Sequence, residues 1–118
     1  MKIIVPLDEN QKDVCVSFGR TPLFLLYDTE TKEEECLVNP AAEAEGGAGI
    51  LAAQFVVDSK AQVLITVRCG ENAAEVLKDA QMKIYKSSVT DARENIALYE
   101  EEKLEELTRF HAGFHGGH

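Results

Sequence analysis

Apolar residues in this chain follow two patterns, short unbroken runs and runs with helical spacing. Residues 63–77 contain both. Residues 63–67 are an unbroken apolar or β-branched run, which is typical of a strand covered on both faces and therefore central in a sheet. A turn at Cys69-Gly70 leads into a segment whose apolar positions recur at i, i+3, i+4 and i+7, which predicts a helix lying on the sheet. These apolar positions are Ala73, Val76, Leu77 and Ala80.

The same patterns predict the rest of the fold. Strands are expected at residues 2–7, 23–28, 35–38, 63–67 and 82–85, and helices at residues 50–57 and 72–80. A third helix is expected after Thr90, a residue type favoured at the N-cap. An early hairpin followed by alternating helices and strands indicates an α/β domain, a mixed sheet of about five strands with helices on both faces and one antiparallel strand. Residues 1–108 are expected to form this single domain, and residues 109–118 a flexible glycine- and histidine-rich tail.

Composition narrows the function classes. The 118 residues carry a net charge of −9 and no basic stripe, which argues against general nucleic-acid binding. An acidic surface that keeps the protein soluble accounts for this charge. No apolar run approaches the ~20 residues of a membrane span, and the first apolar run is too short for a signal peptide, so a cytoplasmic location is expected. The three cysteines lack C-x-x-C spacing, which favours reduced thiols.

Cys69 and Gly70 occupy the place where open α/β sheets bind ligands, beyond the carboxyl end of a central strand. A thiol at a helix N-terminus beside Arg68 is expected to have a lowered pKa. It would then serve as a nucleophile or as a ligand for a soft metal. A nucleophile needs a base to activate it, and all three histidines lie in the tail. The alternative is that Cys69 only fills the end of the strand.

Two further features suggest an anion site. Gly46, Gly47 and Gly49 precede a predicted helix, where freed backbone N–H groups and the positive helix end attract anions. The run matches neither a P-loop nor a G-x-G-x-x-G motif, and a sharp turn into the helix explains these glycines equally well. Arg20, in the turn after Gly19, is a cation suited to holding an anion, or else an exposed structural arginine.

The tail contains His111, His115 and His118. Three imidazoles on one segment can bind a transition metal, weakly unless the protein supplies further ligands. The spacing is not that of a helical H-E-x-x-H zinc site. A tail without function remains the alternative.

Several short motifs resemble a known family in their order and spacing. They are Met1-Lys2-Ile3-Ile4-Val5-Pro6, Phe18-Gly19-Arg20-Thr21-Pro22-Leu23-Phe24, Asn39-Pro40-Ala41-Ala42 followed by Gly46-Gly47-Ala48-Gly49-Ile50, and Cys69-Gly70-Glu71-Asn72-Ala73. Together they span essentially the whole chain, which resembles the dinitrogenase iron–molybdenum cofactor biosynthesis family. One position departs from the family. Many members carry a histidine just before the Phe-Gly pair, and this chain has Ser17, so no ligand role is carried over there.

The resemblance implies a ribonuclease-H-like α/β fold without nuclease chemistry. It also implies a carrier or chaperone for a metal–sulfur cluster or its precursor. In the family, the loops after Pro6, around Gly19-Arg20, around the glycine run and around Cys69-Gly70 border one cleft. Small stand-alone members occur in organisms without nitrogen fixation, so the family name alone does not establish a link to nitrogenase.

We therefore expect a non-enzymatic, cytoplasmic protein that holds a metal–sulfur cluster containing iron, with molybdenum or copper as alternatives. The expected cluster-binding residues are Gly19, Arg20, Gly46, Gly47, Gly49, Cys69 and Gly70. The expected metal ligands are Cys69, His111, His115 and His118. Expected partners are cluster donor or acceptor proteins, with no nucleic acid and no membrane, and the protein would be a monomer or weak dimer.

Two other function classes are weighed against this one. A regulatory module would bind a partner protein through its acidic surface, without metal. A hydrolase on the same scaffold would need clustered acids at strand ends to bind Mg²⁺. Only Asp8 and Asp28 lie near predicted strand ends.

Overall fold

The computed structural model describes residues 1–112. All the strands and helices expected from the sequence are present, with ends that differ by one or two residues. In chain order the elements are β1 (Lys2–Leu7), β2 (Leu23–Asp28), β3 (Glu34–Val38), α1 (Ala48–Asp58), β4 (Val63–Thr66), α2 (Glu71–Asp79), β5 (Lys83–Lys86) and α3 (Ala92–Glu100).

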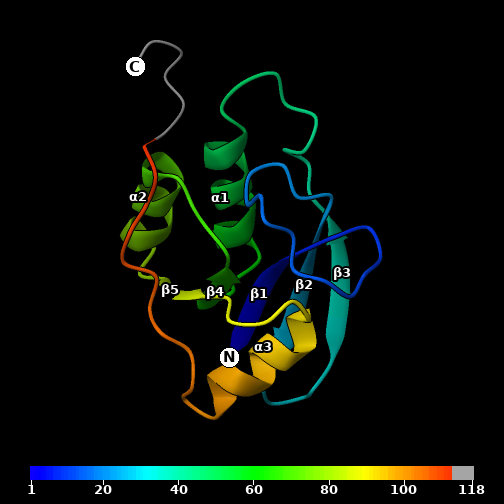
Figure 1. Ribbon diagram of the computed structural model, residues 1–118. Helices are drawn as coiled ribbons and strands as arrows, with labels where there is room; N and C mark the ends of the chain where they lie inside the picture. Colours follow the sequence, from blue (N-terminus) through cyan, green and yellow to red (C-terminus); the bar gives the residue numbers. More distant parts are fainter. Residues whose placement is uncertain (113–118) are drawn as a thin grey trace.

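The strands form one mixed sheet in the order β3-β2-β1-β4-β5 (Figure 1). β2 pairs antiparallel with both β1 and β3, whereas β1 pairs parallel with β4 and β4 parallel with β5. β2 is therefore the one strand that runs against the others. The predicted mixed five-stranded α/β fold is confirmed, and the finer ribonuclease-H-like label remains a prediction.

The middle strand of the sheet is β1, with β4 beside it. All four residues of β4 are buried, as its unbroken apolar run predicts. β1 pairs with β2 along its whole length but with β4 only at Ile3 and Ile4. Pro6 has no N–H to donate, and its carbonyl oxygen instead accepts from the amide of Cys15 at 3.0 Å. The loop after β1 thus provides a hydrogen-bond partner to the end of β1, beyond the residues that pair with β4.

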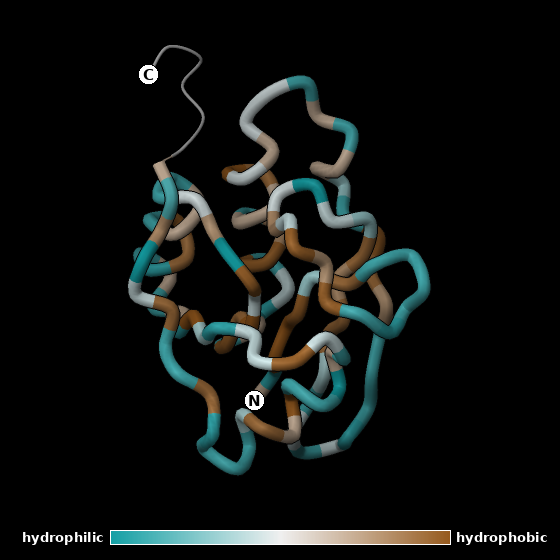
Figure 2. Tube along the Cα trace, in the orientation of Figure 1, coloured by the Kyte–Doolittle hydropathy of each residue, from teal (hydrophilic) through white to brown (hydrophobic). Residues whose placement is uncertain are grey.

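Helices cover both faces of the sheet. α1 and α2 lie side by side on one face (Figure 1), where Ala52, Val56 and Leu77 pack against strand residues such as Leu64. α3 covers the other face through Ala92 and Ile96. Figure 2 shows the resulting hydrophobic centre along the strands and hydrophilic outer loops. Within residues 1–112, none of the helices is long and apolar enough to span a bilayer.

The structure differs from the expected flexible tail at residues 109–112. After α3 the chain turns back along the sheet edge, and residues 104–112, hereafter the C-terminal strap, run beside β5 and α2 (Figure 1). The amide of Leu107 donates to Ile84 O at 2.9 Å, and the amide of Lys86 donates to Glu105 O at 2.8 Å. The folded part of the chain therefore extends beyond Thr108. Residues 113–118 lie outside the described residues.

The third helix begins one residue later than predicted. Asp91, not Thr90, is its N-cap, because the Asp91 carboxylate accepts a hydrogen bond of 2.9 Å from the amide of Glu94. Thr90 contributes only its backbone, since its carbonyl oxygen accepts from the amide of Val14 at 2.8 Å. The carboxylate of Asp91 also suits the positive end of the helix.

We expect Asp91→Ala to lower the free energy of unfolding by about 0.5–2 kcal/mol, because it removes the acceptor for one first-turn amide. Thr90→Ala is the matched control and should change that free energy by less than about 0.5 kcal/mol. Urea denaturation followed by circular dichroism measures both. Equal losses in the two variants would contradict the assignment of Asp91 as the cap.

Candidate functional site

A cleft of about 770 Å³ opens beyond the carboxyl ends of β1 and β4. Four segments that are distant in sequence line it: residues 16–20, residues 45–50, residues 68–70 with 72–73, and the strap residue His111. The seven residues expected to bind a cluster all lie on this lining: Gly19, Arg20, Gly46, Gly47, Gly49, Cys69 and Gly70. The structure thus brings them into one place, and their roles as ligands stay predictions.

The loop around Gly19 lies directly against the start of α1. A Cβ atom at Gly19 would come within 3.0 Å of the Gly49 amide nitrogen and 3.1 Å of its Cα. A side chain at position 19 would therefore push the two backbones apart by a few tenths of an ångström. The side chain of Asn39 holds the loop there, because its amide nitrogen donates to Gly19 O at 3.0 Å and to Thr21 O at 2.9 Å.

Both helices on this face point uncapped N-termini into the cleft. The N-cap positions are Gly47, which has φ +68°, and Gly70, and within residues 1–112 neither helix has a side-chain cap. The amides of Gly49 and Asn72 also find no backbone acceptor within the described part of the chain. α3, on the other face, is capped. The cleft therefore gathers unsatisfied N–H groups and two positive helix ends, which is the arrangement that binds anions.

Two arginines add positive charge to the cleft. Arg20 is anchored by a hydrogen bond of 3.1 Å from Nη1 to Ala42 O. Arg68 lines the same cleft, and its exposed side chain makes no hydrogen bond or ion pair with residues 1–112. Glu45 is the one carboxylate there among the described residues. In a protein of net charge −9, this local excess of positive charge is selective for an anionic ligand.

Cys69 does not have the lowered pKa expected from the sequence. The residue is 1% exposed and belongs to the hydrophobic core beneath α1 and α2. Burial raises the pKa of its thiol to about 11, and the positive charge of Lys78 offsets only part of that effect. The N-terminus of α2 and the neighbouring Arg68 do not lower this pKa, because Cys69 Sγ is buried in the apolar core. The thiol donates its hydrogen bond to Gly70 O, at 3.6 Å. The thiol is therefore protonated at neutral pH and a poor nucleophile.

His111 reaches the cleft through the C-terminal strap. Its amide donates to Cys69 O at 3.3 Å, and its carbonyl oxygen accepts from the amide of Glu71 at 2.9 Å. Its ring lies over Gly70, since a Cβ there would meet Cε1 at 3.2 Å. His115 and His118 lie outside the described residues. Within residues 1–112, no three histidine, cysteine, aspartate or glutamate side chains gather closely enough to hold a metal ion.

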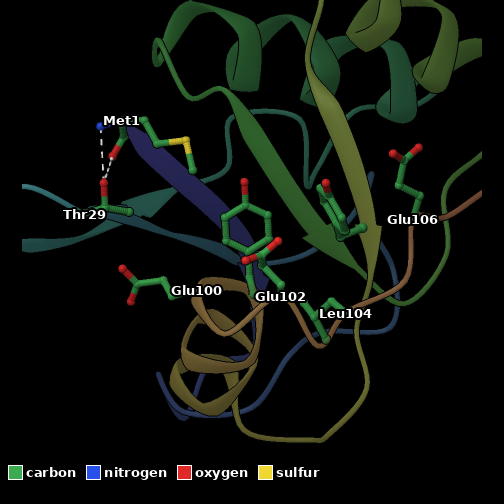
Figure 3. A pocket seen from close by; sticks show the side chains of 8 residues that line it. Met1, Thr29, Glu100, Glu102, Leu104 and Glu106 are labelled. Atoms are coloured by element: carbon green, nitrogen blue, oxygen red, sulfur yellow. Dashed lines mark hydrogen bonds between the residues drawn. The ribbon is translucent and has the colours of Figure 1, made fainter.

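A second hollow of about 680 Å³ lies at the opposite end of the sheet, where β1 begins. Glu100, Glu102 and Glu106 line it (Figure 3). Tyr85 and Tyr99 also line it, and their rings meet edge to face at 5.0 Å. Three acidic groups would repel an anion. The two hollows therefore suit ligands of opposite charge, and the cleft at the strand ends is the candidate site for an anionic ligand.

The sequence profile of the family described as dinitrogenase iron–molybdenum cofactor matches residues 1–102. The chain belongs to this family. The apo form of the orange protein from Desulfovibrio gigas has a TM-score of 0.84 and 27% identity, over 91% of this chain and 92% of that one. A proposed NifB protein from Thermotoga, of the DUF35 family, has a TM-score of 0.76 and 34% identity, over 92% and 95%.

A protein from Methanocaldococcus jannaschii has the same fold, with a TM-score of 0.71 and 18% identity over 92% of this chain and 96% of that one. No curated protein matches the sequence.

Sequence reasoning missed two features of the cleft. It placed His111 in a flexible tail, and the only hint otherwise was Phe110, an apolar residue that packs against the core. The sequence pointed to Arg68 only as a neighbour of Cys69. In the structure, Arg68 follows β4 and itself lines the cleft.

Gly19→Ala should lower the free energy of unfolding by about 1–3 kcal/mol, because the new methyl group would lie only 3.0 Å from the Gly49 amide nitrogen and the loop and α1 must shift apart to relieve the contact. Gly46→Ala is the control, since a Cβ at Gly46 meets nothing within 4 Å. Urea denaturation of both variants provides the measurement. A Gly19→Ala protein as stable as Gly46→Ala would show that the two backbones do not touch.

A titration of the thiolate absorbance should give Cys69 a pKa near 11, against the ordinary value of 9.0. The variant Cys15→Ser/Cys36→Ser isolates this thiol, and the triple variant that adds Cys69→Ser supplies the tyrosine background. The pKa of this thiol is higher in the folded protein than in the unfolded chain. Its contribution to the free energy of unfolding is therefore fully present below pH 9 and is lost as the pH rises from 9 to about 11. A midpoint at or below 9 would contradict its burial.

Proposed function

We propose that this protein carries an anionic metal–sulfur cluster, or a precursor of one, as cargo in the cleft. The observation that carries the proposal is the convergence of two uncapped helix N-termini and two arginines on one concave surface of an acidic protein. Sulfides and thiolates bound to iron or molybdenum leave such clusters with net negative charge. Backbone N–H groups and guanidinium groups stabilise that charge by hydrogen bonds to sulfur.

The family supports the same cargo. Its description names an iron–molybdenum cofactor, and the orange protein of Desulfovibrio gigas, 27% identical, is described in an apo form, a term for a protein without its ligand. Iron is the first expectation for the metal, and molybdenum or copper are the alternatives.

The proposed binding is mainly electrostatic, with few direct metal ligands. The candidate ligands are His111, at the rim, and Cys69, which must lose its proton and its burial to coordinate a metal. Electrostatic binding by backbone amides suits a carrier, because cargo held without strong covalent bonds is released readily to an acceptor protein. Donor and acceptor proteins of the same cluster are the proposed partners, and the cytoplasm is the proposed location.

We propose no enzymatic activity for the chain. A hydrolase on this scaffold would require neighbouring acids for Mg²⁺. Asp8 follows the carboxyl end of β1, whereas Asp28 pairs with Lys2 at its amino end, so the two acids lie at opposite ends of the sheet. The Cys69 thiol is buried and protonated at neutral pH, so it is a poor nucleophile.

Tetrathiomolybdate, a coloured molybdenum sulfide dianion, is a suitable probe of this proposal. Added without oxygen to the purified protein, it should co-elute in gel filtration with molybdenum and sulfide in fixed ratio to protein. Parallel reconstitution with iron and sulfide tests the iron cluster. Arg68→Gln should weaken tetrathiomolybdate binding about tenfold, the effect expected for loss of one charged hydrogen-bond donor.

Lys83→Gln is the matched control, because Lys83 is an exposed cation on β5 outside the cleft. It removes the same charge and should leave the affinity unchanged. Failure of both reconstitutions to give a bound metal, or equal affinity of the two variants, would reject an anion-binding cleft. Metal-independent binding of a partner protein would then favour the regulatory module.

A further inference from the structure

The C-terminal strap is attached to the domain at two places, each an isolated β-bridge. At β5, residues 105–107 form an additional short antiparallel pairing through two backbone hydrogen bonds of 2.8 and 2.9 Å. At the cleft, a second bridge joins His111 to Gly70, also through two backbone hydrogen bonds, of 3.3 and 2.9 Å. Residues 108–112, between Leu107 and the end of the described chain, are held only by this second attachment and by Phe110.

Phe110 rests on the part of the core that contains Cys69. Its ring packs against the core cluster of α1 and α2, to which Cys69 belongs, and the Lys78 ammonium lies 4.3 Å from the ring centre. The same ammonium acts on the Cys69 thiol. Phe110 and Cys69 thus belong to the same packed core, and the next strap residue, His111, contacts Cys69 directly through its backbone amide.

His111 completes this cover from the cleft side. Its backbone amide donates to Cys69 O and its carbonyl oxygen accepts from the Glu71 amide, so the two bonds hold Gly70 from both sides. Its ring occupies the space that a side chain at Gly70 would fill. The Cys69-Gly70 wall of the cleft thus keeps its shape through contacts with residues that enter from the far end of the chain.

We propose that residues 108–112 form a latch that opens without unfolding of the domain, and that its opening exposes the Cys69 thiol to the cleft. The packing of one half-buried ring, its cation–π contact and one bridge are few contacts to break. Segments held in this way open locally at much lower cost than the whole fold. The latch is a property of the protein without cargo. That it admits Cys69 to the metal of a bound cluster rests on the proposed function.

Thiol labelling of the full-length protein tests the latch directly. Cys15→Ser/Cys36→Ser leaves Cys69 as the one cysteine of the chain, and the rate of its reaction with a disulfide reagent is followed at neutral pH in low urea concentrations. Local opening predicts a rate that depends on urea much less steeply than global unfolding does.

Phe110→Ala in this background should raise the labelling rate about tenfold through loss of the ring and its cation–π contact. His111→Pro, which removes the donor to Cys69 O, should also raise it. The matched control is Ile96→Ala, which destabilises the core under α3 without touching the latch. Its labelling at low urea should equal that of the parent.

A Phe110→Ala rate equal to the parent rate, or a urea dependence equal to that of global unfolding, would overturn the latch. If Ile96→Ala accelerates labelling as much as Phe110→Ala does, exposure occurs by general unfolding, and the latch is equally rejected.

The labelling requires no cargo, so it can succeed even if tetrathiomolybdate does not bind. If tetrathiomolybdate binds, protection of Cys69 in the Phe110→Ala variant but not in Ile96→Ala would support access of the thiol to the cargo. Equal labelling with and without bound tetrathiomolybdate in Phe110→Ala would reject that access.

Discussion

The buried side-chain amide of Asn39 fixes the geometry on which the cleft depends. It is 3% exposed, donates to Gly19 O and Thr21 O, and accepts from the amide of Ala41. One side chain thereby satisfies polar groups from two loops that are 20 residues apart. Because an unsatisfied buried carbonyl is costly, neither loop can move away from the other. This constraint presses Gly19 against α1 and leaves the uncapped helix end facing the cleft.

The sheet itself leaves the room for this arrangement. Pairing between β1 and β4 stops after Ile4, and the proline at position 6 removes one donor from the central strand. Loops can then lie between the ends of β1 and β4, and their backbone groups supply hydrogen-bond partners to strand residues that no longer pair with each other. The site is built from backbone amides and glycines more than from reactive side chains, which suits binding better than chemistry.

The sequence predicted the strands and helices well because each buries a regular apolar pattern, as residues 63–67 illustrate. It placed Cys69 and Gly70 at a binding edge because ligands bind beyond the carboxyl ends of such strands, whereas the meeting of the Gly19, Gly46 and Cys69 loops was expected from the family resemblance. It could not predict the pKa of Cys69, because burial depends on how α1, α2 and the strap pack over the thiol. It also missed the return of His111 to the cleft, since a contact between residues 41 positions apart in a glycine-rich context has no local pattern. The cap of α3 was missed by one residue because Thr90 and Asp91 are both good caps.

The separation of charge over the molecule has a kinetic consequence. With a net charge of −9, the body of the protein repels a distant anion, whereas the arginines and helix ends attract it only within the cleft. The Debye length is about 8 Å at physiological ionic strength, so salt screens the long-range repulsion more than the contacts inside the cleft. An anion should therefore arrive faster as salt is raised, opposite to the usual behaviour of electrostatically steered association. The acidic exterior would act as a selectivity barrier that slows the encounter with small anions in dilute solution.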